Sequence, residues 1–153
     1  MEIYKATLND LKDLIQLRID FLKMDAGHLS EEDEKAIRAQ LKGYFEKHLP
    51  SGDFIATIAK MDGNIASAAF LVIEERPANL AFITGIAATL LNVITYPEYR
   101  HRGLATKVVE AIIQEAKKIG VSSIDLFSTG EGKRIYKKLG FKQPAYEAMR
   151  LKL

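Results

Sequence analysis

Residues 92–106 read NVITYPEYRHRGLAT, and this stretch decides both the fold and the most informative candidate site. Its first part belongs to an apolar run at 90–95, which predicts a strand buried on both faces. A loop with Arg100, Arg102 and Gly103 then leads directly into a predicted helix. The first turn of a helix leaves N–H groups unpaired and carries partial positive charge, and both features suit a phosphate or pyrophosphate. The stretch therefore predicts an anion site, although a glycine that serves only a turn, beside exposed basic residues, would give the same pattern.

The rest of the chain supplies helices and strands through its hydrophobic periodicity, its caps and its turns. In order, the predicted elements are a strand at 2–7, a helix from Asn9 or Asp10, a helix from Ser30 to Pro50, strands at 53–61, 64–75 and 90–95, a helix to Ile119, a strand at 123–127, a helix at 132–139 and a strand at 146–153. The first half reads as antiparallel and the second as a parallel strand–helix–strand unit. The predicted fold class is α/β, with a mixed sheet flanked by helices, and residues 1–153 read as one domain because no linker or repeat interrupts them.

The composition excludes several classes of function. The chain has 153 residues and no cysteine, which excludes disulfides, thiolate metal sites and cysteine nucleophiles. The N-terminus lacks a basic stretch followed by an apolar run, so we expect no signal peptide and a cytoplasmic protein. Residues 78–96 carry no charge, but polar residues interrupt them and Pro77 and Pro97 bound them. We therefore expect a turn and a strand there rather than a membrane span.

Charge is distributed unevenly along the chain. Residues 97–153 carry 12 Lys or Arg and 6 Asp or Glu, whereas residues 1–96 have a net charge of −4. The basic half would attract an anion, and the alternative is an ordinary solvated surface. Its basic residues are not interleaved with aromatic ones, so we expect no nucleic-acid partner.

Other motifs for anion binding and catalysis are absent from the sequence. A Walker loop would need glycine at position 127 and Ser or Thr at position 134, where Phe127 and Arg134 stand. Neither G-x-G-x-x-G nor G-x-S-x-G occurs. His28, His48 and His101 lie too far apart in the sequence for a local metal signature, so we expect no metal.

Two segments resemble landmarks of the GCN5-related N-acetyltransferases. Residues 100–105, RHRGLA, fill that family's (Q/R)-x-x-G-x-(G/A) pattern, and residues 136–141, YKKLGF, fill its Y-x-x-x-G-F pattern. The order of elements over essentially the whole chain is also similar. The resemblance implies that family's fold, acetyl-CoA as the acyl donor and direct acetyl transfer to an amine.

The resemblance also implies where the donor binds. It places the pyrophosphate on amides of residues 100–106, which we name the signature loop, and the pantetheine arm along the strand at 93–95. The cofactor-binding residues that it implies are Val93, Ile94, Thr95, Arg100, His101, Arg102, Gly103, Leu104, Ala105, Thr106, Ser128 and Tyr136. The chain departs from the family at two places: many members have glycine in place of His101, and an asparagine often contacts the cofactor at the strand end where Ser128-Thr129 stands. Arg134 is one of three basic residues that would reach the 3′-phosphate.

The resemblance to this family also implies which residues are catalytic. Tyr136 corresponds to the family's general acid, which protonates the departing thiolate, and the alternative is a core aromatic. Family members commonly place a carboxylate base on the signature strand, whereas this strand offers only Asn92 and Thr95. Glu74 and Glu75, at the end of the preceding strand, are the remaining candidates, and we take Glu75 as the base, acting through water. The alternative for both glutamates is that they simply lie in solvent at the end of a strand.

The predicted function is therefore N-acetylation of a primary amine of a small molecule or peptide. The alternative is a catalytically weak module of the same fold that binds CoA as a sensor or interaction domain. Residues 25–34 hold five acids and no Lys or Arg, which predicts a cationic acceptor, although helix capping explains three of these acids equally well. We expect no membrane partner, and pairing of an exposed late strand would allow a homodimer.

Overall fold

The computed structural model describes residues 1–153 and contains one five-stranded sheet in the order β1-β2-β3-β4-β5. The elements are β1 (Glu2–Lys5), η1 (Leu8–Asp10), α1 (Leu11–Ala26), α2 (Glu31–Ser51), β2 (Phe54–Met61), β3 (Asn64–Glu75), β4 (Ile86–Thr95), η2 (Pro97–Tyr99), α3 (Leu104–Lys118), β5 (Ser123–Asp125) and α4 (Lys133–Lys138). Strands β1 to β4 are antiparallel neighbours, and β5 runs parallel to β4. The mixed sheet and the parallel β4–α3–β5 unit are confirmed.

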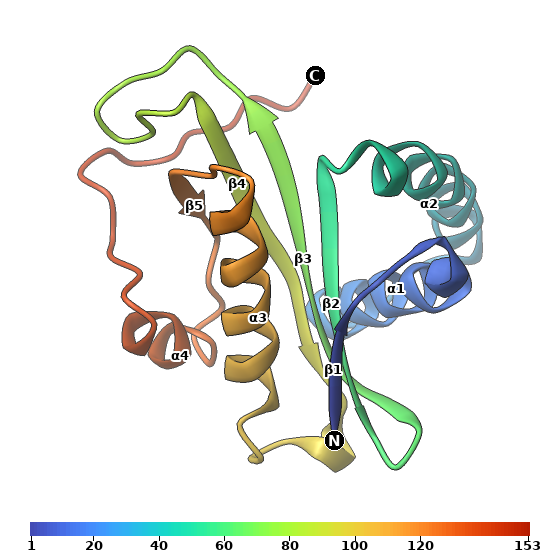
Figure 1. The fold of residues 1–153 in the computed structure, drawn as a ribbon. Coiled ribbons are helices and arrows are strands. Elements are labelled where there is room, and N and C mark those ends of the chain that lie inside the picture. Colours follow the sequence, from blue (N-terminus) through green and yellow to red (C-terminus); the bar gives the residue numbers. More distant parts are fainter.

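Helices cover both faces of the sheet, as Figure 1 shows: α1 and α2 lie on one side, and α3 and α4 on the other. Each face has its own apolar cluster. Phe45, Phe54 and Phe70 lie in the cluster under α1 and α2, with ring centroids 5.0–6.0 Å apart. Val108 and Ile112 of α3 are fully buried in the other cluster. Helices therefore cover the central strands on both faces, and the two edges of the sheet remain free.

The two N-terminal helices begin and end at residues that the sequence marks. The Ser30 hydroxyl accepts a hydrogen bond from the Asp33 N–H at the start of α2, and Gly52 ends that helix in a left-handed conformation with φ of 82°. Thr7 and Asp10 form a capping box just before α1. These caps satisfy helix-end groups that would otherwise be unpaired, which fixes where α1 starts against the sheet.

Strand β4 diverges from its parallel neighbour, and this divergence positions the site. Only residues 87–89 of β4 pair with β5, so the segment 90–95 has a free edge on that side. A register irregularity opposite Ala69 coincides with Asn92, which is buried and has a φ of 55°. The Asn92 side chain donates to the Leu17 carbonyl of α1 at 3.3 Å. The bulge thereby joins the open part of β4 to α1.

Two sequence-based expectations change. Strand β4 begins at Ile86, four residues earlier than predicted, because it pairs with β3 back to Glu75. The predicted strand at 146–153 is wrong: no helix or strand follows α4, and Tyr146 and Met149 are almost fully exposed. Its alternating pattern finds no partner because β5, at the sheet edge, has only three paired residues. Residues 78–96 form a loop and β4, and none of the helices combines the length and apolar composition needed to span a membrane.

Candidate active site

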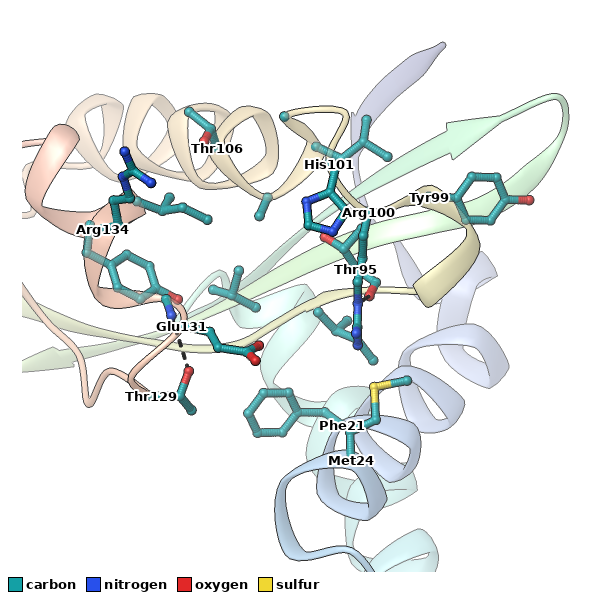
Figure 2. Close-up of a pocket in the computed structure, with 18 of the residues that line it drawn as sticks. Phe21, Met24, Thr95, Tyr99, Arg100, His101, Thr106, Thr129, Glu131 and Arg134 are labelled. Carbon is teal, nitrogen blue, oxygen red and sulfur yellow. Dashed lines mark hydrogen bonds between the residues drawn. The ribbon is translucent and has the colours of Figure 1, made fainter.

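A cavity of about 1040 Å³ opens where β4 leaves β5. Its walls come from α1, the open segment of β4, the signature loop with the start of α3, and the segment that leads into α4. Figure 2 shows Phe21 and Met24 reaching in from α1, across from Thr106 and Arg134. The lining residues are Phe21, Met24, Asp25, Val93, Ile94, Thr95, Tyr99, Arg100, His101, Gly103, Leu104, Ala105, Thr106, Thr129, Gly130, Glu131, Gly132, Arg134, Ile135 and Tyr136.

The signature loop presents a row of unused backbone donors to this cavity. The N–H groups from His101 to Thr106 make no hydrogen bond within the protein, and the first bond of α3 runs from the Lys107 N–H to the Gly103 carbonyl. His101 and Gly103 have φ values of 61° and 73°, so the chain turns tightly before the helix. A left-handed backbone alternating with ordinary conformations directs successive N–H groups toward one centre, as in anion-binding nests. Six donors at a helix start suit a phosphate or pyrophosphate.

Space and charge around the loop also suit an anion. A Cβ at Gly103 would meet no atom within 4 Å, so a ligand can approach the backbone there. Arg100 bends back, and its Nε donates to the Thr95 carbonyl at 3.2 Å. Arg134 faces the cavity from α4 (Figure 2). These guanidinium groups add charge-assisted donors to the positive end of α3.

Tyr136 reaches the cavity from α4 and has a hydroxyl without a partner in the protein. Its ring packs edge-on against Phe141, with centroids 5.8 Å apart. A Cβ at Gly132 would lie 2.9 Å from the ring of Tyr136, so only glycine fits there without a shift. Burial raises the pKa of Tyr136 above its ordinary value of 10. The phenol is therefore fixed in place and protonated at neutral pH, as a proton donor must be.

Tyr96 holds the entry to the signature loop against α1. Its hydroxyl donates to Asp20 at 2.6 Å, and burial together with the nearby Asp20 carboxylate raises the pKa of Tyr96 far above its ordinary value. The Tyr96 N–H also donates to the Ala66 carbonyl of β3. These two bonds fix the point at which the chain leaves β4 for the loop.

Tyr96→Phe is expected to destabilise the protein by about 1.5 kcal/mol at neutral pH, because it removes a hydrogen bond to a charged group. For a chain of this size we expect a Tm lower by roughly 3–6 °C in a thermal melt. Because the pKa of Tyr96 is raised in the folded state, the protonated phenol stabilises the fold below the unfolded-state pKa, and this stabilisation is lost as the pH rises. The difference in Tm between Tyr96→Phe and wild type should therefore shrink above about pH 10. Equal melting temperatures at pH 7 would show that the bond contributes nothing.

Two carboxylates face the cavity, Asp25 from the end of α1 and Glu131 from the segment before α4. Figure 2 shows Glu131 pointing inward between Thr129 and Phe21. Glu34, the last acid of the acidic stretch, instead pairs with Lys23 at 2.6 Å and Arg38 at 2.9 Å. Of that stretch, therefore, only Asp25 lies at the cavity. The structure contains no group of three His, Asp or Glu side chains that would hold a metal ion.

The structure brings most of the predicted site residues together and separates three of them. Arg102 and Ser128 do not line the cavity: Arg102 packs over the Tyr99 ring and donates to the Glu98 carbonyl at 3.4 Å. Glu75 pairs with Ile86, at the opposite end of β4 from Thr95, roughly 30 Å away for nine strand residues. This position corrects the expectation that Glu75 acts as the base.

Sequence reasoning pointed to Asp25 of α1 but missed Phe21 and Met24 of the same helix, and it missed Glu131. Phe21 and Met24 carry no local signal, since an apolar residue on an amphipathic helix ordinarily belongs to the core. Glu131 lies between Gly130 and Gly132 immediately before the helix of Tyr136. That proximity to a predicted catalytic residue was the one signal that could have identified it.

Comparison with known proteins identifies the family of this chain. Residues 53–143 match the family model described as "Acetyltransferase (GNAT) domain". A curated relative, the uncharacterized N-acetyltransferase ycf52 of Pyropia yezoensis, is 31% identical over 91 residues, which cover 60% of this chain. The match spans about half, 48%, of that relative's length.

Solved structures share the fold over nearly the whole chain. A predicted acetyltransferase from Clostridium acetobutylicum, determined with acetyl-CoA, is 27% identical and superposes with a TM-score of 0.86, covering 99% of this chain and 95% of that one. A GCN5-related N-acetyltransferase from Ralstonia eutropha JMP134 is 16% identical, with a TM-score of 0.81 and coverage of 98% and 97%. The second similarity concerns the fold alone.

Proposed function

Because this chain belongs to the GNAT family of acetyltransferases, we propose that it transfers an acetyl group from acetyl-CoA directly to a primary amine of a small molecule or peptide. One observation carries the proposal. The signature loop has six unused N–H groups, and all of its residues except Arg102 line the same cavity as the unpartnered hydroxyl of Tyr136. An anion-binding end and a proton donor thus face one space, as the donor substrate requires.

The donor is held mainly by backbone. Its pyrophosphate accepts hydrogen bonds from the amides of residues 101–106, and Arg134 neutralises further phosphate charge. The pantetheine arm lies along the open segment of β4, where Val93 and Thr95 line the cavity. A relative 27% identical to this chain was crystallised with acetyl-CoA, which supports this choice of donor. A backbone N–H on the free edge of β4 polarises the thioester carbonyl.

The reaction is a direct displacement at the thioester. The neutral amine attacks the carbonyl carbon, a C–N bond forms, and the C–S bond breaks with its electron pair leaving on sulfur. Tyr136 gives its proton to the thiolate and recovers one from solvent. The proton lost by the amine passes to a cavity carboxylate, Asp25 or Glu131, directly or through water. These two groups take the role first assigned to Glu75, and before the reaction they hold the acceptor's ammonium.

Release of free thiol from acetyl-CoA, with a panel of primary amines and peptides, tests the proposal. We expect turnover with a subset of the panel, together with binding of CoA by calorimetry. CoA binding without thiol release for any amine would instead favour the alternative, a binding module. The absence of a carboxylate on β4 is the feature that favours this alternative. Failure to bind CoA at all would contradict both functions.

Three further expectations stay predictions. We propose that the enzyme works in the cytoplasm and that it forms no complex with nucleic acid or membranes. Residues 146–153 are exposed and alternate apolar with basic side chains from Met149 onward, so we retain a homodimer formed through this segment as a prediction.

A further inference from the structure

Arg18 of α1 is a half-buried cation that lacks an acidic partner. Its Nη1 donates to the Asn92 side-chain oxygen at a long 3.3 Å, and its guanidinium lies 5.9 Å from the centre of the Phe21 ring. No carboxylate lies within ion-pair distance of it, whereas Arg38 and Arg76 each have one at 2.9 and 3.2 Å. Burial lowers the pKa of Arg18, and Asp25 only partly offsets this from a distance.

The donors that Arg18 does not use remain open to water. No buried side-chain nitrogen or oxygen in the molecule lacks a hydrogen-bond partner, so the other N–H groups of this guanidinium reach solvent. A guanidinium carries five donors in a fixed fork that matches a carboxylate. Arg18 can therefore bind an anion by displacing water, without breaking an existing ion pair.

Arg18 does not itself line the cavity, but it lies on α1 next to Phe21, which does. Positions 18, 21 and 25 share one face of α1, and Phe21 and Asp25 line the cavity. Figure 2 shows Phe21 at this wall. The residue that Arg18 contacts on β4, Asn92, directly precedes Val93 of the cavity lining. The signature loop lies across the cavity from this wall. A group bound at Arg18 would thus belong to the acceptor and not to the donor.

We propose that Arg18 binds a carboxylate of the acceptor, so that the acceptor is an amino acid or a peptide with a free C-terminus. This inference rests on the proposed acetyl transfer and narrows its substrate class. The wall then complements a zwitterion, with the Asp25 and Glu131 carboxylates for the ammonium and Arg18 for the carboxylate. A doubly charged phosphate fits less well, because the next cation of α1, Lys23, is already paired with Glu34.

Matched substrate pairs test this inference. Amino acids and short peptides are compared with the corresponding carboxamides, and the ratio of the two kcat/KM values is measured from thiol release. We expect wild type to prefer the acids by about tenfold or more, since a hydrogen bond to a charged group is lost in the amide. Arg18→Gln should bring this ratio close to one, and Arg18→Lys should leave an intermediate ratio because it keeps the charge but loses the fork. Lys12→Gln, an exposed cation of the same helix, serves as the control and should keep the wild-type ratio.

The outcomes distinguish a failure of the carboxylate site at Arg18 from a failure of the proposed acetyl transfer. If wild type acetylates acids and amides equally, or if Arg18→Gln lowers both to the same extent, Arg18 only joins α1 to β4 and the inference is overturned while acetyl transfer stands. A second readout does not need turnover: propionate should raise the Tm of the CoA complex of wild type but not of Arg18→Gln. Such stabilisation without any thiol release would support the carboxylate site and contradict the proposed function. Equal stabilisation of both proteins would overturn the inference.

Discussion

Gly103→Val is expected to weaken CoA binding by at least about a hundredfold, because two or more charge-assisted hydrogen bonds from the signature loop are lost. Gly103 has a φ of 73°, a conformation that a β-branched side chain strongly disfavours. Its position faces open space, so valine would project into the room that the phosphates need. The measurement is a calorimetric titration with CoA.

Gly63→Val is the matched control for that experiment. Gly63 occupies the β2–β3 hairpin with a φ of 80°, and a Cβ there also meets no atom within 4 Å. Its backbone strain is thus comparable, but it does not line the cavity. We expect both variants to lose similar stability in thermal melts and only Gly103→Val to lose CoA binding. Unchanged CoA affinity of Gly103→Val would show that the loop is not the donor site.

Tyr136→Phe is expected to lower kcat by about a hundredfold with little change in the affinity for acetyl-CoA, because it removes a general acid and keeps the ring. The ring's contact with Phe141 and its fit over Gly132 do not depend on the hydroxyl. Stopped-flow thiol release and calorimetry measure the two effects separately. Tyr146→Phe, at an exposed position, is the control and should match wild type.

The pH profile adds an independent test of Tyr136. Since burial holds the pKa of Tyr136 above 10, the phenol stays protonated while the acceptor amine loses its proton. In wild type, kcat/KM should therefore rise with pH and begin to fall only above about pH 10. A fall that persists unchanged in Tyr136→Phe would assign that limb to another group and return Tyr136 to a packing role.

Local sequence was sufficient to identify most of the residues on the signature-loop side of the cavity. The loop from Arg100 to Thr106 and the helix of Tyr136 are defined by short spacings, and a helix start carries its unpaired N–H groups wherever it is placed. Residues of this kind can be identified without knowing what packs against them. The cavity lining accordingly includes all but one residue of that loop, together with Tyr136.

Most of the α1 side of the cavity could not be predicted, because it depends on contacts between distant segments. Arg18 becomes informative only when the fold brings it to Asn92, 74 positions away in the sequence. The prediction that Glu75 acts as the base was wrong for a related reason. The sequence shows that a strand ends there, but only the antiparallel register reveals that this end lies at Ile86 rather than at Thr95. The alternation at 146–153 likewise predicts a strand only if a neighbouring edge exists.

Hydrogen exchange at the backbone amides of residues 101–106 tests the central claim most directly. These amides have no hydrogen-bond acceptor in the free protein, so they should exchange quickly. Saturating CoA should slow their exchange, whereas amides of the β2–β3 hairpin around Gly63 should be unaffected. If CoA binds and these amides still exchange at their free-protein rates, the signature loop does not hold the pyrophosphate and the proposed placement of the donor is wrong.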